Sequence, residues 1–159
     1  MSNPECPRTR RVELFVRAEL PRMSEYRRTA VERRLHRLEC AGVLDQYGTT
    51  TWEKRVPVAD EDCPERGRYE VFRDWAARAD ATLSPFFDTR CCYSWETGER
   101  RTELVMPALC LAVYEDEKLV QVAPCARGGT THSIEDCLDD LEAGRVPRPT
   151  GAVTASTAK

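Results

Sequence analysis

The apolar positions in the first half of the chain follow two different periods. Residues 12–18 are mostly apolar with β-branched members, which predicts a strand. Apolar side chains then recur every three or four residues, as on the buried face of a helix: Ala30, Val31, Leu35 and Leu38. Ser24 can cap the start of this helix, and Gly42 can end it. β-Formers are again frequent over residues 49–56, which predicts a second strand.

The second half predicts another helix, three closely spaced strands and a final helix. A hydrophilic connector over residues 59–68 precedes an amphipathic helix whose apolar positions are Tyr69, Phe72, Trp75, Ala76 and Ala79. Short polar turns, typical of antiparallel hairpins, separate three apolar runs: residues 86–95, 102–114 and 119–123. Pro107 predicts a bulge or bend in the middle strand. Ser133 and Asp136 resemble a capping box for the last helix, which Gly144 ends.

The resulting order, β-α-β-α-β-β-β-α, predicts an α+β fold in a single domain over residues 11–144. We expect a mixed sheet with a C-terminal antiparallel meander and helices packed on it. The first β-α-β unit suits a parallel pair with a right-handed crossover. Residues 1–10 are polar and contain prolines, which predicts a flexible lead-in, and residues 145–159 lack any periodicity, which predicts a disordered tail. A chain of 159 residues is long enough for one core.

Charge is distributed unevenly along the chain. Residues 1–58 hold 12 Lys and Arg against 8 Asp and Glu, a net +4, whereas residues 59–159 hold 12 against 19, a net −7. The two halves are therefore suited to different surfaces. The basic residues are mostly Arg, which together with the acidic excess suits a salt-adapted cytoplasm. Since we find neither a signal peptide nor an apolar run of about 20 residues, we expect a cytoplasmic protein and no membrane partner.

The eight cysteines are best explained as reduced side chains, because there is no secretion signal, and several of them lie where a core residue is expected. No C-x-x-C pair occurs among them. An alternative is a zinc site built from Cys91 or Cys92, Cys110 and Cys125, with His132 as the fourth ligand. Structural zinc sites usually begin with a close pair on a turn, which this sequence lacks. We therefore predict no metal and no cofactor.

Two further segments have a functional and a structural interpretation. The glycine-containing loop over residues 127–133 could bind phosphate, or let Cys125 and His132 act as nucleophile and base, but it also suits a plain loop before a helix cap. Aromatic side chains could stack on bases or fill the core: Trp52, Trp75, Phe86, Phe87, Tyr93 and Trp95. No hydrolase, kinase, dinucleotide or metalloprotease motif occurs, so we do not expect an enzyme.

The first predicted helix is rich in arginine, with five candidates for contact with nucleic acid: Arg27, Arg28, Arg33, Arg34 and Arg37. Guanidinium groups bind phosphate oxygens in a bidentate manner, so this helix could lie against a nucleic-acid backbone. Glu25, Glu32 and Glu39 allow the alternative of a solvated face with ion pairs four residues apart, such as Arg28 with Glu32.

Residues 31–45 followed by 49–56 resemble the later part of a winged helix-turn-helix domain: paired leucines, Leu-Glu-x-x-Gly, an apolar pair and a wing strand. The chain from Arg11 to Gly144 also resembles small helix-turn-helix proteins of the winged-helix-like kind that are common in haloarchaea. The shared features are an Arg-x-Glu-Leu-Phe-Val start, a Pro-Phe-Phe segment and a strand that ends in Val-Ala-Pro-Cys. The resemblance implies DNA binding and a role in transcription.

The resulting hypothesis is a DNA-binding transcription regulator of the helix-turn-helix-like class. The arginine-rich helix, with Lys54 and Arg55 at the wing, would contact double-stranded DNA, and a homodimer is compatible with this role. The alternative is a small-molecule-sensing or protein-interaction α+β domain that presents an open sheet face and does not bind DNA.

Overall fold

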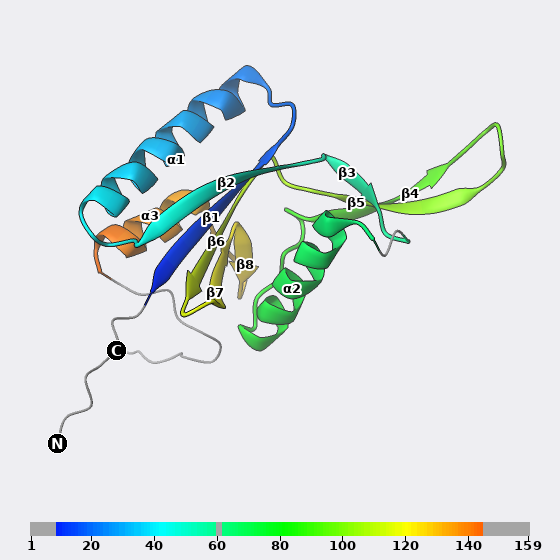
Figure 1. Cartoon of the computed structure of the whole chain (residues 1–159). Helices are drawn as coiled ribbons and strands as arrows, with labels where there is room; N and C mark the ends of the chain where they lie inside the picture. Colours follow the sequence, from blue (N-terminus) through cyan, green and yellow to red (C-terminus); the bar gives the residue numbers. More distant parts are fainter. Residues whose placement is uncertain (1–8, 60–61, 145–159) are drawn as a thin grey trace.

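The computed structural model describes residues 9–59 and 62–144, which form three helices and nine strands (Figure 1). In chain order these are β1 Arg10–Arg17, α1 Arg22–Cys40, β2 Gln46–Trp52, β3 Arg55–Pro57, α2 Pro64–Arg78, β4 Asp88–Tyr93, β5 Arg100–Val105, β6 Leu109–Glu115, β7 Lys118–Ala123, β8 Cys125–Arg127, β9 Thr130–His132 and α3 Ile134–Glu142. The α+β class is confirmed, and the predicted order is preserved.

A four-stranded mixed sheet in the order β2-β1-β6-β7 forms the centre of the molecule. β1 pairs in parallel with β2 and antiparallel with β6, so that Leu14 lies between Thr49 and Leu111. Two parallel neighbours need a crossover, and α1 supplies it, as predicted for the first β-α-β unit.

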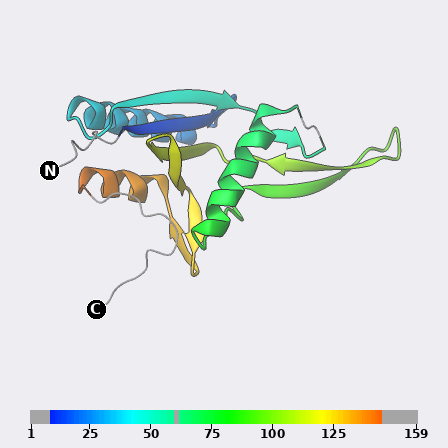
Figure 2. The same ribbon diagram turned by 60° about the horizontal axis from the view of Figure 1, so that its bottom comes forward.

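The two faces of this sheet are covered by different helices, because side chains alternate along β1. Val12, Leu14 and Val16 point into a core formed with α1 and α3. Phe15 points the opposite way, into a second core formed with α2 and the three-stranded sheet β3-β5-β4. There it stacks on Trp52 with ring centroids 4.8 Å apart. Figure 2 shows α2 crossing near the base of the long β4–β5 hairpin, which extends away from the body.

The strands are shorter and more numerous than the sequence predicts. The predicted strand over residues 102–114 is two strands, β5 and β6, which lie in different sheets with Pro107 between them. The predicted meander is therefore two separate hairpins, β4–β5 and β6–β7. Likewise the strand predicted over residues 49–56 is divided into β2 and β3. The segment after Cys125 forms a small hairpin, β8–β9. Its turn consists of Gly128 and Gly129, with φ of 58° and 82°.

The helix ends agree with the sequence in some places and differ in others. The capping box of α3 is confirmed, because the Ser133 hydroxyl accepts a hydrogen bond from the Asp136 amide while the Asp136 carboxylate accepts one from the Ser133 amide, both at 3.0 Å. Gly42 and Gly144 follow their helices with φ of 79° and 76°, as predicted. The predicted cap Ser24 is wrong, since α1 begins at Arg22 after Pro21.

The other predicted boundaries shift, or lie outside the described residues. α2 begins at Pro64, inside the predicted connector, because proline is well suited to the first turn of a helix. Arg10, predicted as the end of the lead-in, already belongs to β1. The rest of the lead-in, apart from Thr9, and the tail from residue 145 fall outside the described residues. No helix in the described ranges is long and apolar enough to cross a membrane.

Candidate nucleic-acid interface

The arginine-rich segment forms α1, a helix of 19 residues that buries one narrow side and exposes the rest. Val31, Leu35 and Leu38 face the sheet at helical spacing and belong to the core. Successive residues turn by about 100° around a helix, so the five predicted arginines point in several directions. Their surroundings fall into three groups.

Two of the five arginines face α3 and bind its carboxylates. The Arg27 guanidinium donates to both carboxylate oxygens of Glu135, at 2.8 and 2.9 Å. Arg34 donates to Asp139 at 2.7 Å and to Glu142 at 3.0 Å. The hydrogen bond from Arg27 lowers the pKa of Glu135, because it favours the charged carboxylate. These four hydrogen bonds form three ion pairs, which hold α1 against α3.

A third arginine, Arg28, lies on the flank of α1 between two glutamates. It contacts Glu25 and Glu32 at 3.5 Å each, three and four residues away. The Glu32 carboxylate also accepts a hydrogen bond from the Thr49 hydroxyl of β2 at 3.4 Å. This is the solvated ion-pair arrangement that the sequence allowed as an alternative.

Arg33 and Arg37 are exposed, and no carboxylate in the described parts of the chain pairs with either. They line a shallow depression together with Thr29, Glu32 and His36. Helical spacing places Arg22 and the exposed Tyr26 on the same side of the helix. We call these four residues the outer face of α1: Arg22, Tyr26, Arg33 and Arg37.

The two basic residues predicted at the wing are close in sequence but lie in different surroundings. Lys54, between β2 and β3, lines a cavity with Arg17 and Pro21, next to the start of α1. Its carbonyl accepts a hydrogen bond from the Met106 amide at 2.8 Å, which fixes the backbone there. Arg55 is exposed on β3, opposite Val105 in the smaller sheet. The structure thus brings Lys54, but not Arg55, to the start of α1.

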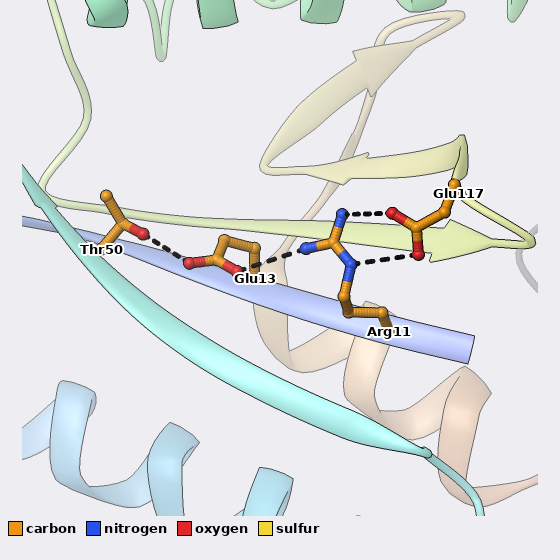
Figure 3. A network of polar contacts seen from close by, with 4 residues as sticks. All are labelled: Arg11, Glu13, Thr50 and Glu117. Atoms are coloured by element: carbon orange, nitrogen blue, oxygen red, sulfur yellow. Dashed lines mark hydrogen bonds and ion pairs between the residues drawn. The ribbon is translucent and has the colours of Figure 1, made fainter. Parts of the chain in front are cut away.

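A polar network on the α2-facing side of the main sheet was missed by sequence reasoning (Figure 3). Arg11 bridges Glu117, at 3.2 Å, and Glu13, at 3.4 Å, and Glu13 accepts a hydrogen bond from the Thr50 hydroxyl. Gly48 makes room for this carboxylate, because a Cβ there would lie 3.2 Å from Glu13 Oε1. The single Arg11 guanidinium lies between two carboxylates, and its ion pairs tie β1 to the turn between β6 and β7. The alternation of charged residues at 11 and 13 is the only local signal for it.

The cysteines and His132 do not assemble into the zinc site considered above. Cys91 and Cys92 lie on β4 in the smaller sheet, whereas Cys110 lies on β6 of the main sheet. Among the described residues no group of three or more His, Cys, Asp or Glu side chains could hold a metal ion. Cys125 lies opposite His132 in β8–β9, but burial raises the pKa of the Cys125 thiol and so disfavours the nucleophilic thiolate.

The aromatic side chains divide between the core and the surface. Trp52, Trp75 and Phe87 are buried in the core on the α2 side. Tyr93 and Trp95, by contrast, are exposed on the β4–β5 hairpin. Core packing therefore explains Trp52, Trp75 and Phe87, but it does not explain Tyr93 and Trp95.

An α+β molecule with an exposed basic helix is compatible with a nucleic-acid-binding protein. A family model described as a helix-turn-helix domain matches residues 4–146, and the chain belongs to this family. No curated protein and no solved structure matches the chain. Within residues 9–59 and 62–144, however, no two helices are joined by a short turn: β2 and β3 separate α1 from α2, and β4 to β9 separate α2 from α3.

Proposed function

We propose that this protein binds double-stranded DNA and regulates transcription, with the outer face of α1 as the contact surface. The observation that carries the proposal is the exposure of Arg33 and Arg37, which have no carboxylate partner in the described chain. Membership of the helix-turn-helix family supports the same function. Catalysis has less support, because the one nucleophile and base pair considered includes Cys125, where burial raises the pKa of the thiol and so disfavours the thiolate.

The dimensions of α1 suit this role. A helix of 19 residues is about 28 Å long, and the major groove of DNA admits a helix. Arg33 and Arg37 lie one turn apart, so both guanidinium groups can reach phosphates or guanine edges on one side of the helix. Lys54 lies near the start of α1, but Glu19 and Glu53 line the same cavity. Lys54 is therefore a weaker candidate for a phosphate contact than Arg33 and Arg37.

The proposal divides the predicted arginines into contact residues and positioning residues. Arg33 and Arg37 would contact DNA. Arg27 and Arg34 would act indirectly, because their bonds to α3 fix the orientation in which α1 presents its outer face. Arg28 is engaged with its own helix.

The division leads to a matched pair of double variants. Arg33→Gln with Arg37→Gln should weaken binding to duplex DNA and lower the slope of log affinity against log salt by about two, since each phosphate contact contributes about 0.9. Thermal stability should not change, because both side chains are exposed and neither has a carboxylate partner among the described residues. Arg27→Gln with Arg34→Gln removes the same charge and should lower the unfolding temperature instead, with little change in slope.

Fluorescence anisotropy titrations over a range of salt concentrations measure the slope, and circular dichroism follows folding. Wild-type protein that fails to bind any duplex at low salt, where non-specific affinity is greatest, would contradict DNA binding. The same result would favour the second candidate function, a protein-interaction domain, for which the exposed Tyr93 and Trp95 are the specific observation.

A further inference from the structure

The β4–β5 hairpin extends beyond the rest of the molecule and has one open edge (Figures 1 and 2). β4 is the last strand of the sheet β3-β5-β4, and in the described chain no strand pairs with its outer side. The Ser94 amide donates to the Glu99 carbonyl at 2.9 Å, so even-numbered residues of β4 direct their backbone groups to β5. The odd-numbered residues Thr89, Cys91 and Tyr93 therefore direct theirs outward.

The three outward residues of this edge are uncharged, and the strand lacks several other features that usually prevent pairing with another strand. It contains no lysine, no proline and no bulge, and all its residues except the half-buried Cys92 are exposed. In the single chain the Asp88 carboxylate accepts a hydrogen bond from the Thr89 amide, at 2.9 Å, and this contact would be exchanged when a strand adds.

The hairpin also exposes two large aromatic side chains. Tyr93 is 54% exposed and Trp95 is 91% exposed, and their rings meet edge to face with centroids 5.7 Å apart. A tryptophan in water at the tip of a hairpin is typical of an interface, where its large apolar area is buried.

We propose that the outer edge of β4 pairs antiparallel, about a two-fold axis, with β4 of a second copy of this chain. Opposite residues in a continuous sheet share a face, and outward residues must meet outward residues. A two-fold axis that passes beside Cys91 meets both conditions and uses all three outward residues. Cys91 then lies opposite the partner's Cys91, and Thr89 lies opposite the partner's Tyr93. A two-fold axis beside Arg90 would place the two copies of this arginine opposite each other, and the repulsion between like charges makes that register unfavourable.

The balanced charge of the hairpin, and the reach of its aromatic tip, favour a second copy of this chain over a nucleic acid as the partner. Residues 88–105 carry three arginines and four carboxylates, so the hairpin does not attract a polyanion. In the two-fold arrangement the aromatic tip of one hairpin reaches the base of the other, where Thr89 and the half-buried Phe86 lie. Each copy then covers the exposed Trp95 of the other. The inference does not rest on DNA binding.

Light scattering coupled to size exclusion measures the mass of the full chain without DNA, under reducing conditions. Wild type should be a dimer, whereas Cys91→Lys and Trp95→Ser should raise the dissociation constant at least about tenfold. Thr102→Lys is the matched control, because Thr102 lies opposite Cys91 on β5, shares its face and is exposed, but is not at the edge. Circular dichroism confirms that each variant folds.

The register has its own test. Opposite residues in an antiparallel hydrogen-bonded pair lie about 5.5 Å apart between Cα atoms, within the range of about 4.4–6.8 Å for a disulfide. Diamide, which takes up the two protons and two electrons released when two thiols join, should link Cys91 to the partner's Cys91. The link should persist in Cys92→Ser and disappear in Cys91→Ser, as peptide mass mapping will show. A monomeric wild type, a dimer insensitive to both edge variants, or a link through Cys92 would overturn the proposal.

Discussion

Neighbouring arginines on α1 lie in different surroundings because a helix turns each residue away from the last. Arg33 and Arg34 are adjacent in sequence, yet one points to solvent and the other binds two carboxylates of α3. The sequence shows five similar residues, and only the packing of α3, more than 100 residues further on, separates them. The candidate contact residues could thus be predicted as a set, but their individual roles could not.

The pair between Arg27 and Glu135 should make part of the stability depend on pH. Glu135→Gln should cost about 0.5 kcal/mol at neutral pH, because both side chains are partly exposed. Arg27 lowers the pKa of Glu135, so the stabilisation is fully present above the ordinary carboxyl pKa of about 4.3 and is lost as the pH falls through the lowered value. The difference in free energy of unfolding between wild type and variant should therefore shrink on acidification.

Urea unfolding at a series of pH values measures this difference. Glu96→Gln, on the exposed turn of the β4–β5 hairpin, removes a carboxylate without a described partner and serves as the control. A difference between wild type and Glu135→Gln that stays constant on acidification would contradict the assigned role of Arg27.

At the scale of elements, local chemistry predicts most of the fold. The capping box of α3 and the glycine that ends α1 involve contacts within a few residues, and both were predicted. The division of one predicted strand at Pro107 was not, because β5 also pairs with β3 and β6 pairs with β1, and both of these partners are distant in sequence. A proline marks a break in a strand, but it does not indicate that the chain enters another sheet there.

Two serines that both precede helical patterns should respond differently to substitution. Ser133→Ala should lower the free energy of unfolding by about 1 kcal/mol, because it leaves the Asp136 amide at the start of α3 without its partner. Ser24→Ala should be neutral or slightly stabilising, since Ser24 lies within α1 and alanine has the higher helix propensity. Thermal unfolding followed by circular dichroism compares the two variants, and equal losses would contradict the assigned caps.

At the scale of the whole molecule, one sheet separates two apolar cores. β1 contributes Leu14 to the core on the α1 and α3 side and Phe15 to the core on the α2 side. β6 does the same with Leu111 and Cys110. Because both cores include the central strands, loss of either should remove support from the other. The fold is thus expected to behave as one cooperative unit despite its two layers of helices.

This expectation can be tested with one substitution in each core. Leu35→Ala opens a cavity on the α1 side and Phe72→Ala one on the α2 side, and each should cost about 3 kcal/mol or more, since both side chains are fully buried. In a Trp95→Phe background, fluorescence reports only Trp52 and Trp75, which lie in the α2-side core, while circular dichroism reports all helices. Fluorescence and circular dichroism should give the same midpoint of thermal unfolding in wild type. Leu35→Ala should lower the unfolding midpoint equally by both signals. If Leu35→Ala lowers the circular dichroism midpoint and leaves the fluorescence midpoint in place, the two sides unfold independently and the single cooperative domain is wrong.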